Sequence, residues 1–150
     1  MQIIKDKQRI DNAWQFIADD EALTAGDITV SLARWQQDKA TLSAHPGKVG
    51  LRLKSTDTVA DIAEDLAIIK LIELDFADFA DGRSFSQAWL LRGRYNYQDE
   101  IRAIGHYLPE QVYYLSRVGV NAYASDKSTD LDLVLNNLND FTVKYQTSII

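Results

Sequence analysis

Strand-like and helix-like segments alternate along most of this chain, and this alternation limits its fold more than any other feature. From Gly26 onward, short runs of apolar and β-branched residues are each followed by a segment whose apolar residues recur at helical spacing. Such an order is typical of strands that run in parallel and are joined by right-handed helical crossovers. The pattern therefore predicts an α/β fold with a mainly parallel sheet of about five strands flanked by helices.

The individual segments can be assigned from their spacing. The expected strands cover residues 28–31, 49–54, 68–76, 100–105 and 120–124. The expected helices are one over 32–44, one with its apolar stripe at Val59, Ile62, Ala63 and Leu66, one with its stripe at Phe85, Ala88, Leu91 and Tyr95, one beginning at Pro109, and one over 131–141. Asp61, Glu64 and Asp65 lie opposite the stripe of the second helix and are expected on its solvent side. Lys70 and Glu73 interrupt the otherwise apolar strand over 68–76, which is expected to be central. At the end of the helix over 131–141, alternating Phe141, Val143 and Tyr145 predict an edge strand or a segment across the sheet.

The length of the chain fits a single α/β domain over residues 1–150. Residues 1–26 differ from the repeating part and are expected to form a hairpin or an extended arm packed on it. Two arrangements of the sheet agree with the pattern, an open doubly wound sheet and a half-barrel. Periodicity does not separate them, because both bury their strands on two sides. We favour the open sheet.

Charge and cysteine content exclude several classes of function. With 22 acidic and 16 basic side chains, the net charge is −6, so a phosphate backbone would repel the chain and nucleic acid is not expected as a partner. The absence of cysteine excludes disulfides, thiolate nucleophiles and thiolate ligation of zinc or iron–sulfur clusters. No apolar run approaches about 18 residues and no signal-peptide pattern occurs, so we expect a cytoplasmic protein without a membrane partner.

Polar residues just beyond the expected strands are the candidates for a functional site, because the C-terminal ends of parallel strands share one edge of the sheet. They are Lys54 and Ser55; Asp75, Asp78, Asp81 and Arg83; His106 and Tyr107; and Ser125 and Asp126. Arg83 and Lys54 would supply charge for an oxyanion, with donors from the first amides of the following helix. His106 stands where a general base could lie.

Simpler interpretations apply to several of these positions. Ser84 and Gln87 have the spacing of a capping box. Asp81 and Gly82 form an ordinary turn dipeptide, and the aspartates of this loop match no metal-binding motif. Arg92 and the arginine two positions later do not face each other on a helix, so one should pair with an acidic neighbour and the other be solvated. No glycine-rich phosphate motif or nucleophilic triad is present, so no cofactor and no catalytic set is indicated.

The chain contains the segment DFADFADGRSFSQAWLLRGRYNY, continued by EIRAIGHYLPEQVYYLSRVGVNAY, and this stretch is similar to a bacterial family catalogued as domain of unknown function 934. AGDITVSLARW and LNDFTVKYQ are similar as well, so the resemblance covers about residues 26–146. Its most specific part is an Asp-Gly-Arg turn followed by Ser-x-x-x-Leu-Leu-Arg, here Asp81, Gly82, Arg83, Ser86, Leu90, Leu91 and Arg92. Ser84 and Asn96 stand where the family commonly has glycine, and His106 where an acidic or varied residue is expected.

The resemblance implies a role in assimilatory sulfite reduction. Members of the family are often labelled probable oxidoreductases, because they tend to be encoded beside a sirohaem sulfite or nitrite reductase. An accessory protein that binds this reductase or its electron donor through exposed aromatic and arginine side chains is therefore expected. Whether the protein is itself an enzyme is left open.

The alternative is a small oxyanion-binding enzyme or sensor with its site at the C-terminal edge of the sheet. Its candidate residues, for an anion or for a partner, are Asp81, Gly82, Arg83, Ser86, Arg92, Lys54 and His106. Exposed aromatic side chains and a C-terminal edge strand would also suit a homodimer.

Overall fold

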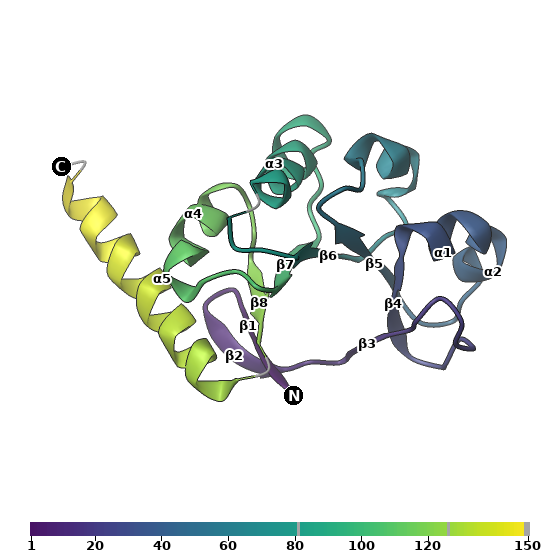
Figure 1. Ribbon diagram of the computed structural model, residues 1–150, viewed down its shortest axis with the longest axis horizontal. Coiled ribbons are helices and arrows are strands. Elements are labelled where there is room, and N and C mark those ends of the chain that lie inside the picture. Colours follow the sequence, from purple (N-terminus) through teal and green to yellow (C-terminus); the bar gives the residue numbers. More distant parts are fainter. Residues whose placement is uncertain (81, 126, 149–150) are drawn as a thin grey trace.

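A computed structural model gives the fold of the chain (Figure 1) and describes residues 1–80, 82–125 and 127–148, with residues 140–148 described by their backbone alone. In this described part, a single eight-stranded sheet has the order β2-β1-β8-β7-β6-β5-β4-β3. The strands are β1 (Gln2–Lys5), β2 (Gln8–Asp11), β3 (Trp14–Phe16), β4 (Asp27–Ser31), β5 (Val49–Lys54), β6 (Leu71–Phe76), β7 (Glu100–Gly105) and β8 (Ala122–Ala124). Strands β3 to β8 are parallel neighbours in chain order, and β1 is antiparallel to β2 and to β8.

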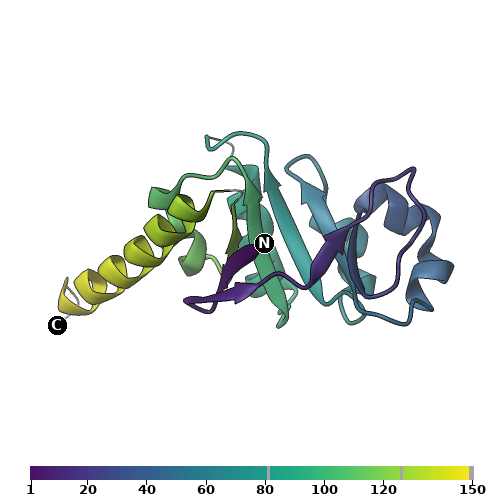
Figure 2. The same ribbon diagram turned by 90° about the horizontal axis from the view of Figure 1, so that it is seen from below.

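Helices connect the parallel strands from β4 to β8 and cover the outer side of a curled sheet (Figures 1 and 2). They are α1 (Leu32–Gln37), α2 (Lys39–Ser43), η1 (Val59–Asp65), α3 (Arg83–Trp89), η2 (Leu90–Arg94), η3 (Pro109–Gln111) and α4 (Val112–Arg117), and a last helix, α5 (Ser128–Ser148), follows β8. The elements η1 and η3 are 3₁₀-helices, and η2 continues α3 as a π-helix. Among the residues that the structure describes, no helix covers the concave side of the sheet, which makes this side available for a site.

The expectation of an open doubly wound sheet is wrong, and the sheet is a half-barrel. A doubly wound sheet reverses its strand order at a switch point, whereas β3 to β8 follow one another without a reversal. Successive right-handed crossovers in one direction place every helix on the same face and curl the sheet. The sheet is also larger than about five parallel strands, because the first 16 residues add two antiparallel strands at one edge and β3 at the other.

The N-terminal arm joins the two edges of the half-barrel. β2 lies at one edge and β3 at the other, although only Asn12 and Ala13 separate them in the chain. The chain therefore crosses the open side of the arc, and Figure 2 shows this crossing in front of the sheet. Oδ1 of Asn12 accepts hydrogen bonds from the Trp14 amide and from Nη1 of Arg102, both at 3.0 Å. The arm expected to pack on the domain is thus part of its sheet and encloses the concave face.

Most of the expected helices form, but their types and limits differ. The segment over 32–44 is helical with a break at Asp38, between α1 and α2. The 59–66 stripe forms a 3₁₀-helix. Asp65 was expected on its solvent side, but it is buried. Its carboxylate is satisfied there, because Nε1 of Trp35 donates to it at 2.9 Å and Lys39 pairs with it at 3.0 Å. The expected C-terminal strand is wrong, since α5 continues to Ser148. Extending a formed helix adds one hydrogen bond for each residue fixed, which a lone terminal strand cannot match.

Candidate functional site

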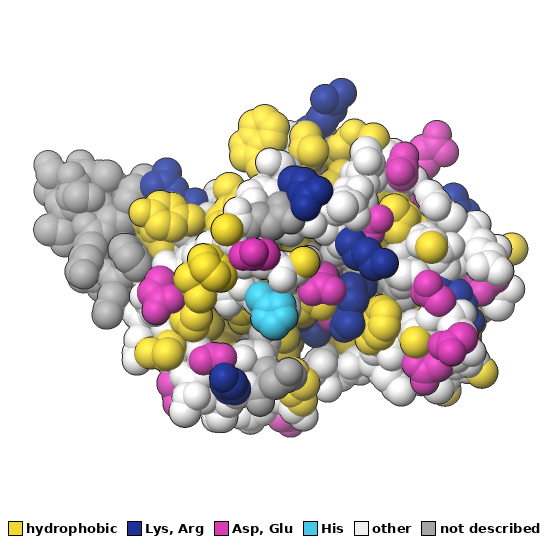
Figure 3. Space-filling view, in the orientation of Figure 1, with side chains coloured by type: hydrophobic (Ala, Val, Ile, Leu, Met, Phe, Trp, Pro, Cys, Tyr) yellow, Lys and Arg dark blue, Asp and Glu magenta, His cyan; other side chains and the backbone are white. Residues whose placement is uncertain are grey.

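A cavity of about 730 Å³ occupies the concave face of the half-barrel and opens at the C-terminal edge of the sheet. Its walls include inward-facing residues of β5, β6, β7 and β8, and its mouth is formed by the loops that follow β6, β7 and β8. Figure 3 views this edge and shows acidic and basic side chains gathered around the hollow. The cavity lies where ligands bind to parallel sheets, at the carboxyl ends of the strands.

A row of charged side chains crosses the middle of the cavity wall. Arg52 on β5, Glu73 on β6 and Arg102 on β7 are neighbours in register. Nε and Nη2 of Arg52 donate to the two carboxylate oxygens of Glu73, at 3.1 and 3.5 Å. Arg102 instead donates to Glu100, at 2.8 Å from Nε and 2.7 Å from Nη2. Glu73 and Arg102 are buried, so the geometry of this row is fixed by its own ion pairs.

Arg52 differs from Arg102 in keeping donors for the cavity. The ring of Phe16 lies 3.8 Å from Cζ of Arg52, so the guanidinium is stacked on one face. Its side chain is 29% exposed, and within residues 1–80, 82–125 and 127–148 its hydrogen bonds involve only Nε and Nη2. Nη1 is therefore the donor that Arg52 can offer to a bound anion.

The mouth of the cavity holds a carboxylate and an imidazole. Asp75, near the end of β6, makes no hydrogen bond or ion pair through its carboxylate with the residues that the structure describes, although Lys54 is its neighbour in register. Gly105 beside it has φ +82°, and a Cβ there would lie 2.6 Å from Oδ1 of Asp75 and 2.6 Å from the carbonyl of Phe76. His106 follows with an exposed side chain, and its amide donates to the same carbonyl at 2.7 Å.

Part of the cavity wall is apolar. Ile3 on β1, Ile104 on β7 and Ala124 on β8 form a buried cluster separate from the main core, and the last two line the cavity. Phe79 and Leu108 are exposed at the mouth. A ligand that fills this space would meet charged side chains on part of the wall and hydrocarbon on another part, as in most small-molecule sites.

The turn singled out from the sequence lies at the expected edge but outside the cavity lining. Gly82 and Arg83 follow β6, which places them on the C-terminal edge, whereas Asp81 lies outside the described residues. Arg83 is exposed and begins α3, and the amide of Ser86 donates to the Gly82 carbonyl at 3.2 Å within that helix. The Ser86 amide is therefore used by the helix rather than offered to an anion.

The capping box expected at the start of α3 is wrong. The helix begins one residue before the expected cap, so Ser84 lies inside it, and the residue at the N-cap is Gly82, which has no side chain to cap the first turn. Nε2 of Gln87 instead donates to the carbonyls of Lys54 at 2.8 Å and Asp57 at 2.9 Å, which ties α3 to the end of β5. The buried hydroxyl of Ser84 and Oε1 of Gln87 have no hydrogen-bond partner in the described part of the chain. The side chain of Lys54 is exposed at the end of β5.

Arg92 lies at the opposite edge of the sheet. Its guanidinium donates to the carbonyls of Gly119 at 2.9 Å and of Tyr97 and Asp99, both at 2.7 Å. These residues precede β8 and β7, where the strands begin. Burial lowers the pKa of the Arg92 guanidinium from its usual value, although Tyr97 and Asp99 act in the other direction. Arg92 thus links the two loops by hydrogen bonds and lies away from the cavity.

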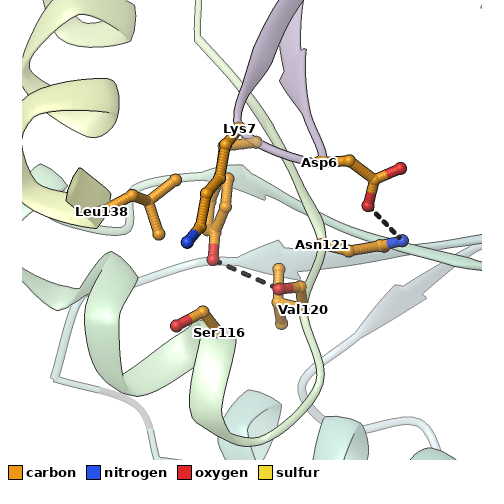
Figure 4. A pocket seen from close by; sticks show the side chains of 7 residues that line it. Asp6, Lys7, Ser116, Val120, Asn121 and Leu138 are labelled. Atoms are coloured by element: carbon orange, nitrogen blue, oxygen red, sulfur yellow. Dashed lines mark hydrogen bonds between the residues drawn. The ribbon is translucent and has the colours of Figure 1, made fainter. Parts of the chain in front are cut away.

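A second cavity, of about 190 Å³, lies at this N-terminal edge (Figure 4). It is lined by Asp6, Lys7, Ser116, Val120, Asn121, Tyr123 and Leu138. Asp6 and Lys7 form the turn between β1 and β2 with φ values of 50° and 65°, and Oδ1 of Asp6 accepts from Asn121 at 3.4 Å. The space is about a quarter of that on the concave face, and none of the residues picked out from the sequence lines it.

The charged row was not found from the sequence, because only residues beyond the strand ends were considered as candidates. A signal was present, since Arg52 stands between Leu51 and Leu53 and Arg102 between Ile101 and Ala103. A charged residue alternating with apolar ones in a parallel strand indicates that one face of the sheet is not covered by helices. Among the described residues, no group of three or more acidic, histidine or cysteine side chains could hold a metal ion.

Comparison with known proteins assigns the chain to a family. The model of the family described as "Bacterial protein of unknown function (DUF934)" matches residues 50–150, which include every parallel strand from β5 onward and most of the cavity wall. No curated protein matches the chain. No helix in the described residues is long and apolar enough to cross a membrane. Since the family model covers more than half of the sequence, the chain belongs to this bacterial family of unknown function.

Proposed function

We propose that this protein binds a small anionic metabolite in the concave cavity, with Arg52 as the group that holds the anion. The observation that carries this proposal is the state of Arg52, which is stacked on Phe16, oriented by Glu73 and part of the cavity lining, while no described residue accepts a hydrogen bond from its Nη1. A guanidinium held in one orientation loses little freedom when it binds, and its planar donors match an oxyanion.

The charge balance of the cavity supports an anionic ligand. Its lining includes the basic residues Arg52, Arg102 and Lys127 and the acidic residues Glu73, Asp75 and Asp130. The wall is thus formally neutral, whereas the whole chain has a net charge of −6. An anion that approaches this acidic protein therefore meets less repulsion at the cavity than over the rest of the surface.

Replacing Arg52 by lysine is expected to weaken binding of small oxyanions. Isothermal titration with sulfite, sulfate, phosphate and short carboxylates should give at least one complex, and Arg52→Lys should weaken it by at least about tenfold, because the planar pair of donors is lost. Lysine keeps a positive charge beside the buried Glu73, so the variant is expected to fold. Arg94→Lys is the control, since Arg94 is exposed on η2. No binding by the wild-type protein, or equal binding by both variants, would contradict the proposal.

A second candidate function is the accessory role in assimilatory sulfite reduction implied by the family resemblance. One observation supports it. Trp89 on α3 and Tyr114 on α4 are 61% and 60% exposed on the helical side of the molecule, where Figure 3 shows hydrophobic side chains at the surface over α3. Tryptophan and tyrosine are enriched among the residues that contribute most to protein interfaces. We propose that this side meets the sirohaem reductase or its electron donor, while the cavity binds the ligand.

Deleting the gene is expected to prevent growth on sulfate while growth on sulfide or cysteine continues. In the same strain, the tagged protein should co-purify with the sirohaem reductase, and the double variant Trp89→Ala, Tyr114→Ala should lose most of the complex. Ile68→Ser is the matched control, because Ile68 is also exposed but lies in the segment before β6, outside the helices α3 and α4. Normal growth on sulfate together with no complex at micromolar concentration would rule this role out.

A further inference from the structure

We infer that the ligand of the concave cavity is a zwitterion of the α-amino acid type, with its carboxylate at Arg52, its ammonium at Asp75 and an apolar side chain along the wall beyond. This inference rests on the proposed binding of an anion by Arg52. It adds a second charged group and an apolar group to the ligand, each assigned to a particular part of the wall.

Asp75 is placed to meet a cation that enters the cavity. Its carboxylate lines the mouth and pairs with none of the described residues, Lys54 included. Gly105 lies against it, and a side chain at that position would overlap its Oδ1 atom. The glycine thus lets β6 and β7 approach closely while the carboxylate stays open. A carboxylate partly removed from water gains most from a ligand that carries a positive charge.

The spacing between Asp75 and Arg52 suits the two charges of one amino acid. The residues lie on adjacent strands and on the same face of the sheet, with Asp75 two positions further along, because Glu73 is the neighbour of Arg52 in register. Strand spacing and rise place their Cα atoms roughly 8 Å apart. Because the arginine side chain is long, the distance between its guanidinium and the Asp75 carboxylate can be shorter than the distance between the two Cα atoms. An ammonium and a carboxylate attached to the same carbon atom can therefore meet both groups at once.

The next residues along the wall favour an apolar substituent. Ile104 lies beside Asp75 in register, and Ile3 lies beside Ala124. Ile104, Ala124 and Ile3 form one buried apolar cluster. The wall therefore changes from the charged Asp75 to the apolar Ile104 over the distance between two neighbouring strands. A substituent on the carbon that carries the ammonium would lie over these residues and bury apolar surface. An inorganic oxyanion would leave most of the cavity of about 730 Å³ unfilled.

Matched ligands test the inference by isothermal titration. Leucine and phenylalanine are compared with isocaproate and hydrocinnamate, which have the same skeletons without the ammonium group. Each amino acid is expected to bind at least about tenfold more tightly than its matched acid, as removal of one charge-assisted hydrogen bond implies. Asp75→Asn should abolish this difference and leave binding of the two acids unchanged. Arg52→Lys should weaken all four ligands.

Asp61→Asn is the control variant, because Asp61 is exposed on η1 in the helical layer. If each amino acid binds no more tightly than its matched acid, or if Asp75→Asn leaves the preference intact, the zwitterion is wrong while the anion site stands. If neither these acids nor the inorganic oxyanions bind, the proposed function itself fails. Leucine binding that is no tighter than glycine binding would remove the apolar part of the inference.

Discussion

Replacing Arg92 by alanine is expected to lower the free energy of unfolding by about 3 kcal/mol, as loss of several hydrogen bonds from one charged donor group implies. The guanidinium is the common donor to the carbonyls of Tyr97, Asp99 and Gly119, which belong to the two loops that start β7 and β8. Its removal leaves these acceptors without their partner and lets the loops separate. Urea unfolding followed by tryptophan fluorescence measures the change.

Arg94→Ala provides the comparison on the same π-helix. Arg94 is exposed and stacks on the Tyr95 ring at 5.8 Å, so its removal should change stability by no more than about 0.5 kcal/mol. Arg92→Lys should be intermediate, because one ammonium keeps the charge but not the fork that reaches three carbonyls. If Arg92→Ala is as stable as Arg94→Ala, the hydrogen bonds from Arg92 to the two loops contribute little to stability. A functional role for Arg92 then becomes the better interpretation of the family pattern.

Raising the pH above about 10 is expected to unfold the protein steeply, because burial raises the pKa of three tyrosines well above their ordinary value near 10. Each hydroxyl also donates to a backbone carbonyl and would lose that bond on ionisation. The bonds are from Tyr97 to Ile69 at 2.8 Å, from Tyr107 to Ala124 at 2.9 Å and from Tyr123 to Val112 at 3.1 Å. The folded state therefore keeps these protons at a pH at which the unfolded chain loses them.

The loss of stability at high pH follows from proton linkage. The stability that these groups contribute is fully present below the unfolded pKa of about 10 and is lost as the pH rises above it, since the folded state then binds more protons than the unfolded state. Each proton changes the free energy of unfolding by about 1.4 kcal/mol per pH unit, so three buried tyrosines give about 4 kcal/mol per pH unit. Urea unfolding at several values between about pH 9 and pH 11.5 measures the slope.

Tyr107→Phe should reduce that slope by about a third, because one of the three linked protons is removed. Tyr114→Phe should leave the slope unchanged, since Tyr114 is 60% exposed and its hydroxyl is not held in the core. The Phe variant loses one hydrogen bond and some stability at neutral pH, so the slope is the quantity to compare. A slope equal in the wild type and in Tyr107→Phe would show that other groups cause the alkaline unfolding.

Local features were predicted well wherever neighbouring residues decide them. The strands over 49–54 and 100–105 have the expected limits, and Val59, Ile62 and Leu66 of the second expected helix are buried as their spacing indicated. Asn96, which replaces a common glycine, has φ 54°, a left-handed conformation that asparagine tolerates. The parallel direction of the strands also followed, because each helical crossover returns the chain to the same edge.

Residue patterns along the chain were enough to predict parallel strands joined through helices, with loops that meet at their C-terminal edge. The curling of the sheet into a half-barrel, and the passage of the chain across its open side at Asn12, became visible only in the folded molecule. The same holds for the shared cavity of Arg52 and Asp75. A period of two shows which residues share a face, whereas strand order and curvature arise from pairings between segments far apart in the chain.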